Sequence, residues 1–402
     1  MSIDVAGKMS ASRSAVASPA AVSRTVGRAR TVAMVGTYPP TACGLATFTS
    51  NLSIAIATPE SRWRVIVVRV LDQPEVETHE EVVAQWIAGD RDSLTRSLAA
   101  IESSDVVLLQ HEYGLFGGRD GQDVLALVGA LSKPLIAVLH TVLSNPTPHQ
   151  REILEQVMAA ASLVVVQSKD ARQRLLTIYS AVPDSVVVVP HGAQENFSGA
   201  SQSIVEHPCV LTWGLLGPGK GIEYAIAAMG RLGDHVPAPT YIVAGRTHPK
   251  VLAAEGERYR RKLQQQCRDL GVSTRVHFDD GYRDWDSLRA LIRSADVVLL
   301  PYDSLDQESS GVLVEALASG KPVVATMFPH ALELLSRGAG VLVRQGDVDA
   351  MSAALERVLY EPGLAETMKR CARREATALL WPTIGATYRS LISHVVSRRE
   401  VT

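Results

Sequence analysis

The chain has 402 residues, of which 46% are hydrophobic and 20% are charged. This excludes wholesale disorder and a collagen-like fibre, and the length favours about two to three domains. The 40 basic and 42 acidic residues give a formal charge of −2, which argues against a nucleic-acid-binding protein. The four cysteines lie far apart in the sequence and are expected to be free thiols in a reducing compartment: Cys43, Cys209, Cys267 and Cys371.

Residues 1–30 are rich in Ala, Ser, Val and Arg but lack the continuous apolar core of a secretory signal. A transit peptide remains open on this composition, but we expect a disordered extension. No later stretch approaches the ~18 uninterrupted apolar residues that a membrane span requires. The sequence therefore predicts a cytoplasmic protein without a transmembrane segment.

Short β-branched runs alternate with longer amphipathic stretches from Thr31 onward. The first expected strands are 32–36, 65–70, 106–110, 135–140, 163–167 and 186–190. The helices expected between them are 45–57, 93–101, 122–131, 149–160 and 171–179. Because the strands are apolar on both parities and alternate with helices, we predict a parallel, doubly wound sheet with right-handed crossovers.

The pattern stops at residues 190–192, passes a polar stretch over 199–207, and then restarts. The second series of expected strands is 209–213, 240–244, 276–278, 297–301, 322–325 and 340–343. Helices are expected over 222–231, 257–270, 287–294 and 313–318, and the last segment, 351–397, is helical without further strands. The simplest architecture is two similar α/β units joined near residue 200.

Open α/β sheets bind ligands at the carboxyl ends of their strands, so the loops that follow the strands are the candidate sites. The first such loop is 36–47, where Gly44 opens a helix whose free N–H groups can meet an anion or a sugar hydroxyl. It is not the GxGxxG dinucleotide fingerprint. A plain strand-to-helix turn explains it equally well.

The second loop, 213–221, has the sequence WGLLGPGKG. Its glycines, including Gly214 and Gly217, permit close approach of the backbone, and Lys220 supplies a point charge suited to a phosphate. The spacing is not that of a Walker loop. The alternative interpretation is a flexible loop with a solvated lysine.

The third loop, 307–315, has the sequence QESSGVLVE. Ser310 is a good N-cap residue, and Gly311 lets the backbone approach a ligand. The dipole of the following helix is directed at a phosphate, and Glu315, one turn into that helix, can accept two hydrogen bonds from a ribose diol. An ordinary capped helix with an exposed glutamate is the alternative.

These loops carry a resemblance to the donor domain of the family 4 glycosyltransferases, over residues 214–225, 244–245, 295–302 and 311–325. Residues 39–44 and 189–197 resemble parts of the first domain of that family, and Trp381 with the helix after it resembles its C-terminal segment. The resemblance covers about residues 31–395. It implies an α/β protein of GT-B fold, in which two Rossmann-like, doubly wound parallel-sheet domains face each other across a cleft.

The predicted organisation has three parts. Residues 1–30 form the extension, and residues 31–200 form an acceptor-side N-terminal domain, with 382–402 packing back on it. Residues 201–381 form the domain that binds the sugar-nucleotide donor.

The resemblance implies roles for individual residues. Lys220 contacts the donor diphosphate, the backbone N–H groups of Gly311, Val312 and Leu313 bind phosphate, and Glu315 binds the ribose. His140 matches the histidine that the family places near the transferred sugar.

Two departures from the family pattern stand out. Leu215 stands where the family has an arginine, and Arg246 is a candidate for supplying the missing cation. Gln307 stands where the family has the first glutamate of a pair, with Glu308 one step away. Gln307 can still hydrogen-bond a sugar hydroxyl but carries no charge.

On the acceptor side, residues 110–120 follow a buried strand, so His111, Glu112 and Tyr113 are expected to line the cleft. The alternative is a packed histidine and a salt-bridged acid. No spacing supports a metal site, so neither a metal nor a cofactor is expected besides the sugar nucleotide as co-substrate.

The sequence thus predicts a retaining glycosyltransferase that moves a hexose, of glucose or mannose type, from a nucleoside-diphosphate sugar to a saccharide or other hydroxyl acceptor. Lys220 and the helix after Ser310 stabilise the leaving diphosphate. As the resemblance implies, retention comes from front-face attack assisted by that phosphate. A catalytically silent sugar-nucleotide-binding protein and a GT-B sugar-nucleotide epimerase remain alternatives, and the oligomeric state stays open.

Overall fold

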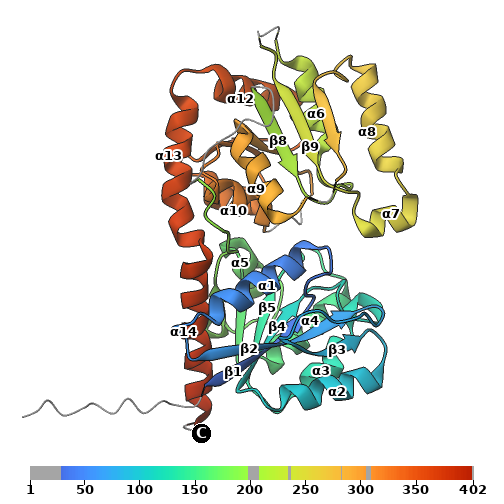
Figure 1. Cartoon of the computed structure of the whole chain (residues 1–402), viewed down its shortest axis with the longest axis vertical. Coiled ribbons are helices and arrows are strands. Elements are labelled where there is room, and N and C mark those ends of the chain that lie inside the picture. Colours follow the sequence, from blue (N-terminus) through green and yellow to red (C-terminus); the bar gives the residue numbers. More distant parts are fainter. Residues whose placement is uncertain (1–28, 198–207, 234–236, 282, 305–308, 401–402) are drawn as a thin grey trace, which may run out of the picture.

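The computed structural model describes residues 29–197, 208–233, 237–281, 283–304 and 309–400 (Figure 1). The predicted extension over residues 1–30 lies outside this part of the chain except for its last two residues, and Arg30 already belongs to the first strand. Two α/β domains lie one above the other in Figure 1, and the C-terminal helices run along one side of both.

The described part of the first domain contains a seven-stranded sheet with the order β3-β2-β1-β4-β5-β6-β7, and every neighbouring pair is parallel. Its strands are β1 (Arg30–Gly36), β2 (Trp63–Leu71), β3 (Val82–Ile87), β4 (Val106–His111), β5 (Leu135–Leu139), β6 (Leu163–Val166) and β7 (Val186–Val188). Its helices are α1 (Gly44–Ile56), α2 (Arg91–Ile101), α3 (Val124–Ala130), α4 (Pro148–Ala160) and α5 (Lys169–Thr177).

The described part of the second domain contains a six-stranded parallel sheet with the order β10-β9-β8-β11-β12-β13. Its strands are β8 (Cys209–Trp213), β9 (Thr240–Ala244), β10 (Val276–Asp279), β11 (Val297–Leu300), β12 (Val323–Thr326) and β13 (Gly340–Val343). The helices of this half are α6 (Ile222–Arg231), α7 (Pro249–Glu255), α8 (Arg258–Asp269), α9 (Trp285–Ser294), α10 (Gly311–Ala318), α11 (Pro329–Leu335), α12 (Val348–Tyr360), α13 (Leu364–Ala376) and α14 (Trp381–Glu400).

The central strands are buried on both faces, as their apolar runs predict. Every residue of β4, β5, β8 and β11 is buried. Helices cover both faces of each sheet because parallel strands need crossover connections, and this arrangement confirms the predicted pair of doubly wound, Rossmann-like domains. The free cysteines are also as expected.

Among the described strands and α-helices, three have no counterpart in the sequence predictions. The edge strand β3 is largely half-exposed, so it lacks the apolar signal of the inner strands. The short helices α7 and α11 each begin with a proline, which is favourable at the first position of a helix but reads as a loop in the sequence.

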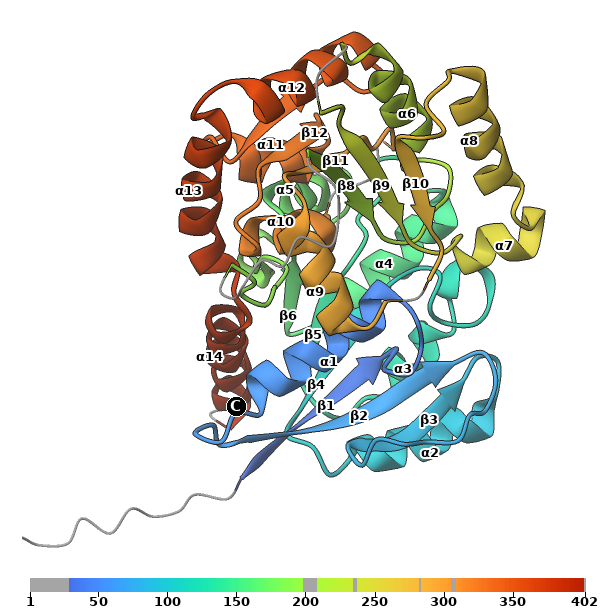
Figure 2. The ribbon, with the colours of Figure 1, turned by 45° about the horizontal axis from the view of Figure 1, so that its top comes forward.

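Two segments connect the domains and pair with each other. The first connecting segment contains Ala193, and the second contains Leu379 and Trp381. The Ala193 amide donates to the carbonyl oxygen of Leu379 over 2.8 Å, and the Trp381 amide donates to that of Ala193 over 3.0 Å. Beyond this pairing, α14 packs along α1 of the first domain (Figure 2). Tyr388 is fully buried there, and Arg389 hydrogen-bonds the carbonyl oxygen of Ala55. The C-terminal helix therefore returns to the first domain.

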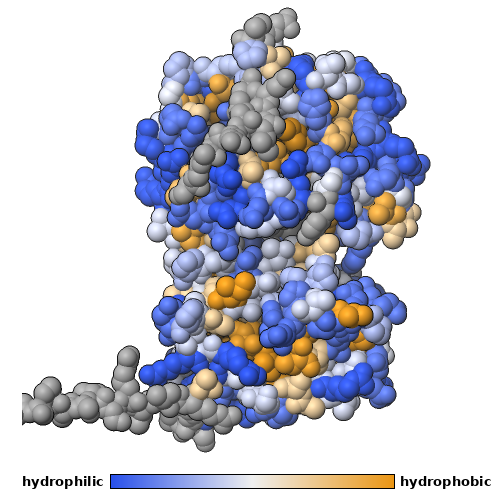
Figure 3. All heavy atoms as spheres, viewed as in Figure 1, coloured by the Kyte–Doolittle hydropathy of each residue, from blue (hydrophilic) through white to orange (hydrophobic). Residues whose placement is uncertain are grey.

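In the space-filling view, the molecule narrows between the two domains (Figure 3). Hydrophilic side chains cover most of this face of the second domain, and an apolar area lies on the first domain around β1 and β2. Among the described residues, no helix has the length and apolar character needed to cross a membrane.

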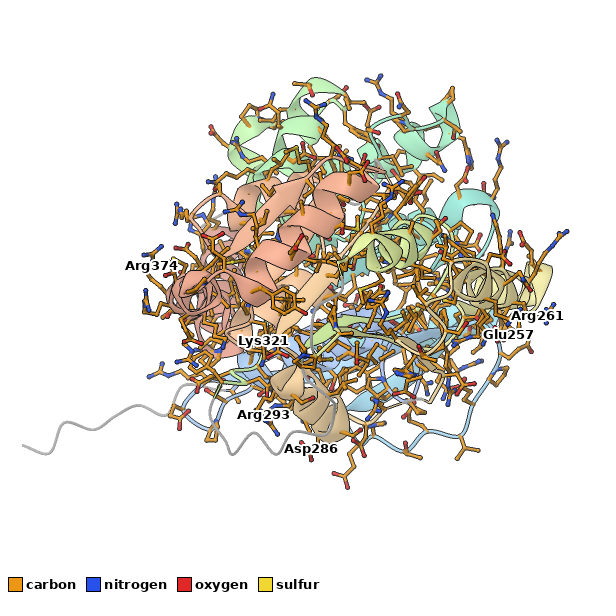
Figure 4. All side chains as sticks on the ribbon, turned by 90° about the horizontal axis from the view of Figure 1, so that it is seen from above. Glu257, Arg261, Asp286, Arg293, Lys321 and Arg374 are labelled. Atoms are coloured by element: carbon orange, nitrogen blue, oxygen red, sulfur yellow. The ribbon has the colours of Figure 1, made fainter. Side chains whose placement is uncertain are left out.

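Buried polar contacts attach the first connecting segment to the second domain. The side-chain oxygen of Asn196 accepts a hydrogen bond from Arg293 over 2.6 Å, and its amide group donates to Ser319 over 3.0 Å. Lys321 lies close to Arg293 in Figure 4 and donates to the carbonyl oxygens of Arg293 and Ala295. Burial lowers the pKa of Lys321 to about 8. These contacts hold the end of α9 and the residues just after α10 against the first connecting segment.

Candidate active site between the domains

The carboxyl ends of β8 and β9 point toward the first domain (Figure 1). The predicted donor loops therefore lie at the edge of the second sheet that faces the interdomain region, which is where open α/β sheets place their ligands. Residues 305–308 lie outside the part of the chain that the structure describes, so Gln307 and Glu308 are not placed.

The start of α10 is built as predicted. The side-chain oxygen of Ser310 accepts a hydrogen bond from the Leu313 amide over 3.2 Å, and the Ser310 amide donates to Nδ1 of His330 over 2.9 Å. Ser310 and His330 are both buried. The amides of Gly311 and Val312 have no partner within the helix, and the helix dipole makes this end attractive to an anion. The Leu313 amide, also predicted to bind phosphate, is instead bonded to Ser310, because Ser310 caps the helix.

The glycine loop places Lys220 beside the end of β11. Gly221 has a φ of +64°, and a Cβ atom at this position would overlap the carbonyl group of Pro301, so only glycine fits. Nζ of Lys220 lies 4.4 Å from the ring centroid of Tyr302, within the range of a cation–π interaction. Gly214 adjoins α10, because a Cβ atom there would lie 3.8 Å from Val312. The second and third predicted loops therefore meet.

Glu315 lies one turn into α10 and is not the exposed glutamate of the alternative interpretation. Its Oε2 accepts a hydrogen bond from Nε1 of Trp213, at the end of β8, over 3.2 Å. Burial raises the pKa of Glu315 to about 7, against an ordinary value of 4.5. Such a carboxyl group can exist in either protonation state near neutral pH, and its ionised form is a strong acceptor.

Two donor-side candidates lie further along the same edge. A Cβ atom on Gly217 would lie 3.2 Å from Val251 of α7, so this glycine allows α7 to pack on the loop. The carbonyl oxygen of Arg246 accepts from the Leu216 amide over 2.8 Å, and the Arg246 side chain is exposed. Arg246 therefore pairs with the residue after Leu215, and its role as the substitute cation stays a prediction.

His140 directly follows β5, which ends one residue earlier than predicted. Nε2 of its ring lies 2.7 Å from Oε1 of Gln110, and Nδ1 lies 3.1 Å from Nε2 of Gln167. Burial lowers the pKa of His140 to about 3, with smaller contributions from His191 and His111, so the ring is neutral. Since both ring nitrogens have protein partners, His140 can meet a sugar through its nitrogens only if one of these contacts opens.

The acceptor-side prediction needs one correction. His111, the last residue of β4, is only 1% exposed, and its ring packs against Tyr113 and Phe116. Burial lowers its pKa to about 4. The expectation that His111 lines the cleft is wrong, because β4 is central and this side chain points into the domain core. The alternative of a packed histidine holds.

Glu112 and Tyr113 follow β4 in the loop that faces the second domain. Glu112 accepts hydrogen bonds from the Thr141 hydroxyl over 2.6 Å and from the Tyr113 amide over 3.0 Å. Burial raises the pKa of Glu112, and the positive charge of Lys250 is among the groups that oppose this shift. The Tyr113 hydroxyl donates to the carbonyl oxygen of Gln150 in α4 over 3.4 Å.

The first predicted loop leads into α1. Gly44 is the first residue of α1, and Cys43 is its N-cap.

Lys250 and His191 lie at this interface but were not among the predicted site residues. A Cβ atom on Gly114 would lie 2.5 Å from Nζ of Lys250, so α7 of the second domain reaches the loop after β4. A Cβ atom on Gly311 would lie 2.9 Å from Nε2 of His191, which comes from the connecting segment. Neither pairing has a sequence signal, because each joins residues from different domains. In the described ranges, no three His, Cys, Asp or Glu side chains form a group that could hold a metal ion.

Comparison with known proteins shows what this chain is similar to. Residues 193–375 match the family described as glycosyl transferases group 1. An uncharacterised glycosyltransferase of Methanocaldococcus jannaschii is 27% identical over 53% of this chain. The match spans 54% of that protein's own length. The MMP alpha-(1->4)-mannosyltransferase of Mycolicibacterium hassiacum is 26% identical over 79% of each chain. The structure of Anabaena HepE with UDP and glucose superposes with a TM-score of 0.74 at 18% identity, covering 91% of this chain and all of that one.

Proposed function

We propose that the chain is a group 1 glycosyltransferase of the family 4 type. In this proposal it transfers a hexose of glucose or mannose type from a nucleoside-diphosphate sugar to a hydroxyl acceptor, and the GT-B fold supports it. The observation that carries this proposal is the convergence of three groups at one sheet edge. These are the backbone N–H groups of Gly311 and Val312 at the start of α10, the ammonium group of Lys220, and the carboxyl group of Glu315.

Each group suits one part of such a donor. The amides at the start of α10 and the charge of Lys220 suit the diphosphate, which gains negative charge as the bond to the sugar breaks. The carboxylate of Glu315 suits two ribose hydroxyls. The HepE structure, which contains UDP and glucose, has the same fold, and this supports a nucleotide sugar as the donor.

We expect transfer with retention, which requires that the acceptor approach on the same face as the leaving group. The bond between the sugar C1 and the phosphate oxygen breaks, and C1 bonds the acceptor oxygen. The acceptor hydroxyl proton passes to the departing phosphate oxygen. The chain then needs to hold both substrates and stabilise the diphosphate, without a metal ion, and closure of the domains brings the substrates together.

A thermal-shift screen of the full chain against UDP-, GDP- and ADP-linked glucose and mannose identifies the donor, because a ligand stabilises by RT ln(1 + [L]/Kd). The selected donor is then incubated with saccharide acceptors, with and without EDTA, and the anomeric configuration of the product is determined by NMR. Transfer with retained configuration in both conditions is expected.

Three other outcomes would contradict parts of this proposal. Donor binding without transfer or hydrolysis selects the silent binding protein, which Leu215 in place of an arginine favours. An isomeric sugar nucleotide formed without acceptor selects the epimerase. Loss of transfer in EDTA would contradict the metal-independent mechanism.

A further inference from the structure

His191 lies where the first connecting segment meets the donor helix. Nδ1 of its ring is 2.7 Å from the carbonyl oxygen of Gly192. A carbonyl oxygen only accepts, so Nδ1 carries the proton and Nε2 of the neutral ring carries a lone pair. The Nε2 edge faces Gly311, since a Cβ atom there would lie 2.9 Å from Nε2 and 3.1 Å from Cε1.

Aromatic side chains from two other elements hold this ring in place. Phe48 of α1 lies 5.0 Å from the His191 ring, centroid to centroid, and Trp381 at the start of α14 lies 6.0 Å away. The ring itself is half-buried. His191 is therefore fixed by the first domain and the C-terminal helix, while its Nε2 edge faces the second domain.

We propose that His191 is a further donor-site residue that takes up a proton when a diphosphate binds at the start of α10 and then donates a hydrogen bond from Nε2 to the leaving phosphate. This inference rests on the proposed function, because it assumes that α10 receives a diphosphate. It deepens that function by assigning a second cation, besides Lys220, to the leaving group.

The chemistry requires the proton. A neutral Nε2 and a phosphate oxygen are both acceptors and repel each other, whereas a protonated ring forms a charge-assisted hydrogen bond. The proton comes from solvent on binding and returns to solvent when the nucleoside diphosphate leaves. In the transfer step itself, the proton on the phosphate still comes from the acceptor hydroxyl, so His191 remains protonated throughout.

The surrounding groups leave His191 neutral until an anion arrives. His140, on the side of the first domain, and His330 of α11 are both buried with pKa values of about 3, so neither carries charge near neutral pH. On the donor side, the described residues that carry or can gain a charge include Lys220, Asp303 and Glu315. Burial lowers the pKa of His191 to about 4. A bound diphosphate raises it, because a nearby anion favours the protonated form.

The test is titration calorimetry of the full chain with UDP, GDP or ADP, whichever the donor screen selects. The titration is run at pH 6.5 in two buffers of different ionisation enthalpy, which gives the number of protons taken up. His191→Asn keeps an amide near Gly192 but has no atom at the position of Nε2. His191→Gln places an N–H donor near that position but cannot gain a proton.

We expect the wild type to take up close to one proton more than either variant. His191→Asn should also bind the nucleoside diphosphate about tenfold more weakly, while His191→Gln keeps most of the affinity. The contribution of Glu315 is common to all three proteins and cancels in the difference. His394→Asn, which removes an exposed histidine from α14, is the matched control and should equal the wild type.

Equal proton uptake by the wild type and both variants would overturn this inference while leaving the donor site intact. Failure of the wild type to bind any nucleoside diphosphate would instead overturn the proposed function. If His191→Asn does not fold, as judged by circular dichroism, the proton count of His191→Gln alone decides the question.

Discussion

The ammonium group of Lys220 lies 4.4 Å from the centroid of the Tyr302 ring, so a cation–π contact holds it near the end of β11. Since charge develops on the diphosphate as the sugar leaves, Lys220 should stabilise the transition state more than the bound donor. We expect Lys220→Ala to lower kcat at least tenfold, with a factor of ten for each 1.4 kcal/mol lost.

Steady-state kinetics with the identified donor measures this effect. Lys262→Ala, which removes an exposed lysine from α8, is the control and should keep the wild-type kcat. An unchanged kcat in Lys220→Ala would place the phosphate site elsewhere.

The ionisation of the Glu315 carboxyl group affects both the stability of the protein and its binding of the nucleoside diphosphate. Its pKa is about 7 in the folded protein and about 4.5 when exposed, because burial penalises the ionised form. The folded chain therefore binds more protons than the unfolded chain between these pH values, and stability falls as pH rises through this window. Glu315→Gln should be more stable than the wild type at pH 8 and differ little from it at pH 5.

Urea denaturation at the two pH values checks this sign. The same variant should bind the nucleoside diphosphate more weakly at pH 8, because a neutral amide is a poorer partner for two ribose hydroxyls. A variant that lost stability at pH 8 would show that the carboxylate is stabilised by groups other than Trp213.

At the scale of elements, α7 connects the two domains through Lys250. Nζ of Lys250 lies against Gly114 and acts electrostatically on the buried carboxyl group of Glu112. Because these first-domain residues lie in the predicted acceptor region, Lys250→Ala should lower kcat/KM for the acceptor several-fold. It should leave the affinity for the nucleoside diphosphate unchanged.

Acceptor kinetics and calorimetry separate the two effects. Arg261→Ala, on the adjacent helix α8 (Figure 4), removes an exposed cation of the same domain and should alter neither quantity. A loss of nucleotide affinity in Lys250→Ala would instead assign this lysine to the donor.

At the scale of the whole molecule, the two domains are joined where the segments that contain Gly192 and Trp381 cross, and the stability of the protein depends on how these segments pack. The Trp381 ring covers Gly192 so closely that a Cβ atom there would overlap it. The side chain cannot move freely, because Trp381 is buried beside Phe48. Gly192→Ala should therefore destabilise the protein by about 1–3 kcal/mol.

Chemical denaturation provides the measurement. Gly129→Ala is the matched control, since it adds the same methyl group in helix α3 where no atom lies within 4 Å. That change should be neutral or stabilise by about 0.5–1 kcal/mol. Equal stability of the two variants would show that the crossing adapts.

The sequence alone determined the two parallel sheets and the glycine-rich loops at their edges. Apolar runs such as those of β4 and β11 report burial on both faces of a sheet, and this signal is local. The N-cap at Ser310, the glycine at 221 and the start of α10 are local for the same reason. The edge strand β3 escaped prediction because only part of it is buried.

Only the tertiary structure decided which strand-end histidines reach the interdomain region. His111 ends an apolar strand and His191 follows one, yet His111 packs into the core of the first domain and His191 faces Gly311. The approach of Lys250 to Gly114 likewise depends on how the crossing at Ala193 and Leu380 sets one domain against the other. Periodicity reports burial within a domain, whereas contacts between domains depend on their relative placement, which no local pattern encodes.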